Sequence, residues 1–262
     1  MNSLFTLPRS AVAARLATLA MCLCAVGVGA QSSADLPFAP GEKFEYSGRV
    51  HVGVSGHGTL RVDGPSQLRG TTVWTLHSDM EGKLGFIRAS DRSVSWIDPV
   101  HMSALRYTSR ERHILTKHDD DVSIFASEKR WSADDGQEGP LVSDEPLDEL
   151  SFLYFLRTLP LADEAELSVS RHYDAARNPT IVRVVGREDI DVGAGRFHAV
   201  IVEMRVRDAR RYKGEGTIRI HLSDDACRLI LRLESNMPDA GKATLALSSY
   251  EGMRSACTAR IE

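Results

Sequence analysis

A basic excess is missing from this chain of 262 residues. It carries 32 Lys and Arg residues against 36 Asp and Glu residues, which gives a formal net charge of −4 at pH 7. Proteins that bind nucleic acid present a basic face to the phosphate backbone. The mild acidity therefore indicates that nucleic acid is not a partner of this protein.

Catalytic motifs are missing as well. No GxSxG nucleophile elbow occurs, and the nearest segment, GVSGHG around Ser55, lacks the required glycine spacing. His51 and His57 are six residues apart and His113 and His118 five, with no evident third ligand for zinc. We therefore expect no catalytic residue, no metal ion and no cofactor, and we interpret the protein as a non-enzyme.

The densest acidic run lacks the pattern of a calcium site. Asp119, Asp120 and Asp121 stand together in KHDDDVS. An EF-hand loop alternates its acidic ligands and places a glycine at its centre. This run does neither, so we interpret it as a solvated acidic turn.

The chain also lacks an apolar run long enough to span a membrane. The longest, Leu16–Gly29, follows Arg9 and Arg15 and ends at small residues before Gln31. At about 1.5 Å per residue, it is too short for a hydrocarbon core of roughly 30 Å. A basic start, a short apolar stretch and small residues are typical of a secretory signal peptide.

The leader predicts the fate of the N-terminus. We expect a cleaved signal peptide over residues 1–30, cut after Ala30, and a flexible lead-in over residues 31–40. The mature protein is then periplasmic or secreted, with no transmembrane span. The alternative is a lipoprotein anchored through Cys22, because Leu19 and Cys22 match a lipobox although Met21 replaces its usual small residue.

Cysteine is scarce, with four residues in the chain. Cys22 and Cys24 leave with the predicted signal peptide, so Cys227 and Cys257 remain. An even pair in an exported chain predicts one disulfide bond. Two buried free thiols are the alternative that the sequence leaves open.

What the sequence does contain is the alternation typical of β-strands. In TTVWTLHSDM, Val73, Thr75 and His77 alternate with Trp74 and Leu76. Similar short segments recur along the chain, separated by turns rich in Gly, Asp and Pro. We predict a mainly β protein, an open or nearly closed antiparallel β-barrel, formed by a single β-rich domain over residues 41–262.

One segment departs from this pattern. In DELSFLYFLRTLPL, Asp148 can cap a helix that runs from about Glu149 to Thr158 and stops before Pro160. Its side chains are apolar nearly all round, which is typical of a buried helix. It either completes the core or covers a ligand cavity, and the candidates to line that cavity are Trp74, Phe152, Tyr154 and Phe155.

Four motifs together resemble a known family. GEKFEYSGRVHVGVSGHGTLRVDG, DELSFLYFLRTLPL, VGREDIDVGAGRFHAVIVE and IRIHLSDDACRLILRLES occur in the order found in exported bacterial proteins of the domain-of-unknown-function 3108 family. The resemblance spans about Pro40 to Gly252 and implies an exported, β-rich protein without an assigned activity. It also implies a fold similar to the periplasmic lipoprotein carriers, a likeness that does not by itself establish function.

The predicted fold favours a binding protein over an enzyme. The first hypothesis is an uncharacterised exported envelope protein that binds an apolar ligand, such as a lipid or an acyl chain, without catalysis. The alternative is a structural or protein-interaction component of the cell envelope with a filled core. The two differ in whether the interior of the barrel is empty or filled, which the sequence leaves open.

Overall fold

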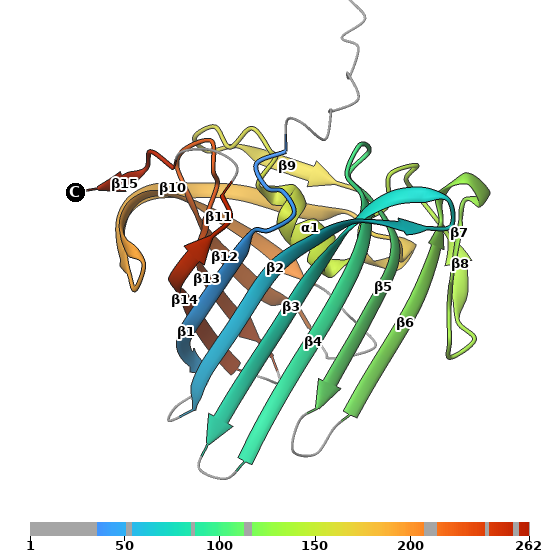
Figure 1. The fold of residues 1–262 in the computed structure, drawn as a ribbon, viewed down its shortest axis with the longest axis horizontal. Coiled ribbons are helices and arrows are strands. Elements are labelled where there is room, and N and C mark those ends of the chain that lie inside the picture. The colour runs from blue at the N-terminus through green and yellow to red at the C-terminus, as the bar shows by residue number, and fades with distance from the viewer. Residues whose placement is uncertain are drawn as a thin grey trace, which may run out of the picture.

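One curved antiparallel sheet dominates the computed structural model, which describes residues 36–50, 54–84, 87–112, 117–206, 214–238, 241–253 and 257–261. The first arm of the sheet runs from blue to green in Figure 1. Its strands are β1 Lys43–Val50, β2 Ser55–Leu68, β3 Thr71–Leu84, β4 Ile87–Asp98, β5 Ser103–Arg112, β6 Lys117–Phe125, β7 Arg130–Ala133 and β8 Glu138–Pro140.

The second arm is formed by the C-terminal half of the chain and runs to red in Figure 1. Its strands are β9 Glu166–Val169, β10 Thr180–Val192, β11 Gly195–Val206, β12 Gly216–Ser223, β13 Ile230–Met237, β14 Gly241–Glu251 and β15 Arg260–Ile261. The arms meet where β1 pairs with β14, and β15 pairs with β11.

The sheet does not close into a complete barrel. Strand order runs from β8 at one end to β9 at the other, and no pairing joins these two strands within the described residues. The prediction of a mainly β protein with an open antiparallel barrel is confirmed. Short turns account for the neighbour-to-neighbour order: Arg69 and Gly70, between β2 and β3, both adopt positive φ (51° and 81°), as a two-residue type I′ hairpin turn requires.

The single α-helix, α1 Glu149–Leu156, lies between the two arms (Figure 1). It begins at Asp148, whose carboxylate accepts hydrogen bonds from the backbone of Leu150 and Ser151, both at 2.9 Å. The Ser151 hydroxyl accepts in return from the Asp148 N–H at 2.8 Å, which completes a capping box. The helix ends two residues earlier than predicted, because Arg157 already serves as its C-cap.

A buried ion pair fixes the C-terminal end of α1 to the start of the sheet. Arg157 and Glu42 have side-chain exposures of 0% and 1%, and two hydrogen bonds of 2.6 and 2.9 Å join them. The same guanidinium donates to the Cys227 carbonyl at 3.0 Å and lies over the rings of Phe38 and Phe44 at 5.3 and 5.2 Å. Such a pair holds its neighbours in one arrangement, because either charge left alone would be costly.

The expectation of a flexible lead-in is wrong for residues 36–40. Leu36 and Phe38 are 2% and 0% exposed and belong to the main core. Phe38 packs edge-on against Tyr154 of α1, with 4.9 Å between ring centroids. Leu36 and Phe38, on either side of Pro37, therefore anchor this segment in the core. The predicted signal peptide and Cys22 lie outside the described residues.

The second cysteine pair forms the predicted disulfide. Cys227 and Cys257 are bonded, with their Cα atoms 5.4 Å apart, so the alternative of two free thiols does not hold in this structure. The bond joins the loop after β12 to the segment before β15. It therefore holds the C-terminal segment against the part of the chain that contacts Arg157.

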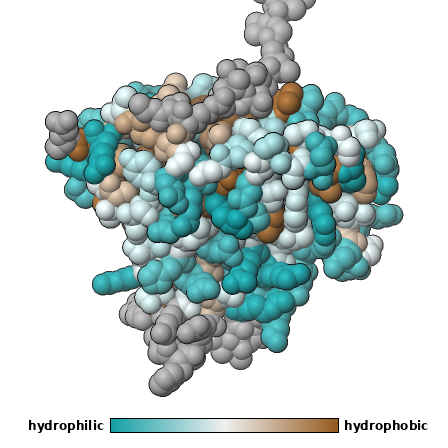
Figure 2. All heavy atoms as spheres, in the orientation of Figure 1, coloured by the Kyte–Doolittle hydropathy of each residue, from teal (hydrophilic) through white to brown (hydrophobic). Residues whose placement is uncertain are grey.

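The surface carries few apolar side chains. In the face shown in Figure 2, hydrophilic residues cover most of the described surface and the hydrophobic areas are small. Among the described residues, the exposed large hydrophobic side chains are Val100, Val142 and Val185. No described helix is long and apolar enough to cross a membrane.

Candidate functional site

A cavity of about 610 Å³ lies between α1, the segment from His172 to Thr180 and strands β10 to β14. Its volume falls within the range of roughly 300–1,000 Å³ that small-molecule sites occupy. The open sheet creates this space because α1 fills the interior of the barrel only in part. The cavity is therefore the candidate functional site of the described structure.

Apolar side chains form most of the cavity wall. From α1, Phe152 and Leu153 face it. The opposite wall is formed by aliphatic and sulfur-containing side chains of neighbouring strands: Met204, Val206, Ile218, Ile220, Leu233 and Leu245. Alternate residues of a strand point to the same face of a sheet, which explains how β11 and β12 each contribute a pair two residues apart.

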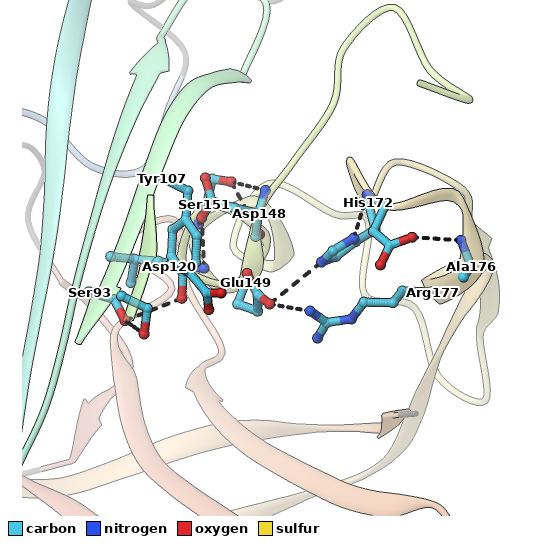
Figure 3. A network of polar contacts seen from close by, with 12 residues as sticks. Ser93, Tyr107, Asp120, Asp148, Glu149, Ser151, His172, Ala176 and Arg177 are labelled. Carbon is cyan, nitrogen blue, oxygen red and sulfur yellow. Dashed lines mark hydrogen bonds and ion pairs between the residues drawn. The ribbon is translucent and has the colours of Figure 1, made fainter. Parts of the chain in front are cut away.

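The end of the cavity near the start of α1 is polar. Glu149, in the first turn of the helix, pairs with Arg177 (Figure 3). His172 Nε2 lies 3.7 Å from Glu149 Oε1, too far for a hydrogen bond. Burial opposes ionisation of Glu149, but the Arg177 guanidinium and the His172 ring hold the pKa of this carboxyl well below its ordinary value.

The segment that carries His172 is held by its own hydrogen bonds. Asn178 accepts from the His172 backbone N–H at 2.9 Å and donates to its carbonyl at 2.8 Å. The His172 Nδ1 atom accepts from the Asp174 N–H at 3.0 Å. A ring nitrogen that accepts carries no proton, so Nε2 carries the proton of this imidazole and is its donor.

The structure brings only one of the four predicted cavity residues to the cavity. Phe152 lines it, whereas Trp74, Tyr154 and Phe155 are not among its lining residues. Trp74 packs edge-on against Phe38 at 6.0 Å between ring centroids, and Phe155 lies beneath the Arg171 guanidinium at 4.6 Å.

Tyr154 belongs to the core on the opposite side of the helix. It is fully buried, and burial raises the pKa of its hydroxyl far above the ordinary value. Its ring also packs against Arg157, 5.5 Å from the guanidinium carbon to the ring centroid. The all-round apolar helix therefore divides its side chains between a filled core and the cavity.

Sequence reasoning missed the polar end and the strand wall. Glu149 and His172 are 23 positions apart, and only the return of the chain after α1 brings them together. The one signal that pointed to Glu149 was its place next to the helix cap. The aliphatic residues of β11 to β14 read as ordinary sheet core.

Within the described residues, the acidic and histidine motifs of the sequence do not come together in one site. Asp119 and Asp121 pair with Arg112 and Arg106 and remain at least partly exposed to solvent, but they are on strand β6, so the expectation of a turn is wrong. Each carboxylate reaches an arginine of β5 that is two positions away from its directly opposite residue, which is a diagonal cross-strand pairing. His51 and His113 lie outside the described residues.

Within the described residues, the group with metal-ligating potential is Asp225, Cys227 and Cys257. Both sulfur atoms are in the disulfide, and a thiolate is what a metal ion binds. The Asp225 carboxylate accepts from the backbone of Cys227, Thr258 and Ala259 at 3.1, 2.7 and 2.8 Å. This cluster is accounted for by its part in closing the C-terminal loop.

The match to a sequence family agrees with the motifs. The profile of DUF3108, described as a protein of unknown function, matches residues 44–248. The chain belongs to the DUF3108 family. No curated protein matches this DUF3108 chain.

Among solved structures, one with a TM-score of 0.53 resembles this DUF3108 protein in fold alone. A β-barrel-like protein of the DUF1849 family from Brucella abortus is 9% identical, with a TM-score of 0.53 over 80% of this chain and 96% of the other. A candidate exported protein with a YmcC-like fold from Bacteroides fragilis is 10% identical, with a TM-score of 0.34 over 83% and 98%. A candidate lipoprotein from Parabacteroides distasonis is 11% identical, with a TM-score of 0.31 over 82% and 97%.

Proposed function

We propose that this DUF3108 protein is an exported, non-catalytic binding protein that holds an apolar molecule, such as a lipid or an acyl chain. The observation that supports this is the cavity of about 610 Å³ with a mainly apolar wall. Transfer of an apolar chain from water into such a space is favourable, by roughly 0.8 kcal/mol for each buried methylene group. A ligand of this kind gains affinity without any special chemistry from the wall.

The alternative is a structural or interaction protein of the envelope with a filled core. The core is indeed filled around Phe38 and Tyr154, which are both 0% exposed. The space on the other side of α1 favours the binding function over this alternative, because a concave and mainly apolar pocket of that size is typical of small-molecule sites.

Export is supported by two independent features. The first 30 residues have the pattern of a secretory signal peptide. The Cys227–Cys257 disulfide suits an oxidising compartment such as the periplasm or the exterior. The mass of the mature N-terminus tests this: a chain that begins at Gln31 supports cleavage after Ala30, whereas a lipidated Cys22 supports the anchored alternative.

Native mass spectrometry of the protein purified without detergent from an exporting cell tests the binding function. We expect a fraction of the protein to carry one apolar adduct that organic solvent removes. Leu153→Trp places a larger ring on the cavity wall, which narrows the space for a ligand and should reduce the adduct. Phe155→Trp is the matched control, because Phe155 is on the same helix but does not line the cavity, and it should retain the adduct.

Two outcomes count against the proposal. One is a wild-type protein that takes up no apolar molecule from cells or from added lipid. The other is an adduct of equal amount in both variants, which places it away from the cavity. Circular dichroism of each variant checks that the sheet is intact.

A further inference from the structure

The charged side chains that line the cavity are already in ion pairs with other residues of the protein. Four acidic and three basic residues line it, and each has a partner of opposite charge. The pairs are Glu149–Arg177, Arg183–Glu166, Glu203–Arg219, Arg205–Glu215 and Glu234–Arg232. An ionised head group would enter this space without a counter-charge, which is strongly unfavourable.

Two polar atoms at the inner end of the cavity do lack partners. Within the described part of the chain, neither Glu149 Oε2 nor His172 Nε2 has a hydrogen-bond partner, and both atoms are closed to solvent. A buried polar atom without a partner costs about 1–3 kcal/mol. A polar group of a ligand that bonds to these two atoms therefore removes this cost.

The two atoms have complementary roles. Glu149 is ionised, so Oε2 accepts, and His172 Nε2 carries the proton and donates. They belong to groups that already approach within 3.7 Å of each other (Figure 3). A hydroxyl group donates one hydrogen bond and accepts others, so a single hydroxyl satisfies both atoms at once.

Access to this pair requires a small movement. The Glu149 side chain lines the cavity and is 31% exposed, although its Oε2 atom is closed to solvent. A hydroxyl group therefore reaches Oε2 only when this side chain rotates toward the cavity. The His172 ring, 7% exposed and fixed by the Asp174 N–H, remains in place.

We propose that the ligand is an uncharged amphiphile whose hydroxyl group bonds to Glu149 and His172 while its apolar chain lies against Phe152 and strands β11 to β14. This inference rests on the proposed function, since it names the class of ligand for the same cavity. It separates neutral long-chain alcohols from fatty acids and from cationic amines of equal chain length.

Calorimetric titration of the mature protein, freed of lipid, with four ligands of equal chain length tests the inference. The ligands are dodecanol, dodecyl methyl ether, dodecanoic acid and dodecylamine, each below its aggregation concentration at neutral pH. We expect dodecanol to bind about tenfold more tightly than the ether, because the ether cannot donate to Glu149. The acid and the amine should both bind more weakly than the alcohol.

Paired variants locate the hydroxyl group. Glu149→Gln removes the charged acceptor and should reduce the alcohol-to-ether ratio to about one to threefold. Glu128→Gln is the matched control, because it removes the same charge from a glutamate that pairs with Arg130 and does not line the cavity, and it should leave the ratio near tenfold.

The outcomes separate the two proposals. If none of the four ligands binds, the binding function itself fails. If ether and alcohol bind equally well to the wild type, or the acid binds most tightly, the cavity binds apolar chains and the hydroxyl inference is overturned. If Glu149→Gln keeps the full alcohol preference, the hydroxyl lies elsewhere and the assignment to Glu149 is overturned.

Discussion

Replacing Arg157 by methionine should cost more stability than any substitution of a surface arginine. Methionine keeps much of the side-chain volume but leaves Glu42 buried, at 1% exposure, without its counter-charge. Removing one partner of a buried ion pair costs about 3–5 kcal/mol. The Cys227 carbonyl also loses its donor at 3.0 Å, a further cost of roughly 1 kcal/mol.

Urea unfolding followed by circular dichroism measures the effect. With a slope of about 3 kcal/mol per molar urea, a loss of about 4 kcal/mol lowers the midpoint by more than about 1 M. The matched control is Arg196→Met, which removes an exposed pair with Asp189 at 3.3 Å and should cost less than about 1 kcal/mol.

A double substitution separates the contribution of the ion pair to stability from the contribution of side-chain packing. Arg157→Met combined with Glu42→Leu removes both charges, so it should recover at least half of the loss. A loss below about 1 kcal/mol in Arg157→Met contradicts the assigned role of the pair. So does a double variant whose loss is the sum of the two single losses.

Two further substitutions test the start of α1 and the disulfide that holds the C-terminal segment. Burial raises the pKa of Asp148 to about 7, against a weaker opposing effect of its hydrogen bonds from Ser95 and Ser151, so the folded protein holds this proton more tightly than the unfolded chain. The stability that this proton contributes is complete below about pH 4 and is lost as pH rises through 7. The free energy of unfolding of the wild type, relative to that of Asp148→Asn, should therefore fall by up to about 4 kcal/mol from pH 4 to 8. A free-energy difference between the two proteins that stays constant or rises over this range contradicts the prediction. Replacing both Cys227 and Cys257 by alanine opens a loop with a sequence separation of 30 and should cost about 3–4 kcal/mol in the same unfolding assay, whereas an unchanged midpoint argues against the bond.

The strands were predictable because alternation is a local property. Val73 and Thr75 are buried in β3, as the period of two indicated for a sheet with a covered face, although Leu76 of the alternate set is buried as well. The helix was predictable for a similar reason, since Asp148 and Ser151 form the capping box within four residues of sequence. Local signals of this kind need no knowledge of the rest of the fold.

The cavity was not predictable because it depends on distances that the sequence does not contain. Phe152 and Tyr154 are two positions apart in one apolar segment, yet one faces the cavity and the other the filled core. The side of the helix on which each ring is buried depends on the curvature of the sheet and on the buried Arg157–Glu42 pair. The anchoring of Leu36 and Phe38 was missed for the same reason, since their partners are far along the chain.

The most direct test of the account is a titration of the lipid-free mature protein with dodecanol, compared between wild type, Leu153→Trp and Phe155→Trp. We expect one binding site in the wild type and in Phe155→Trp, and weaker binding in Leu153→Trp, whose larger ring narrows the cavity. Binding of equal strength in all three proteins, or in none, would contradict the claim that this cavity is the functional site.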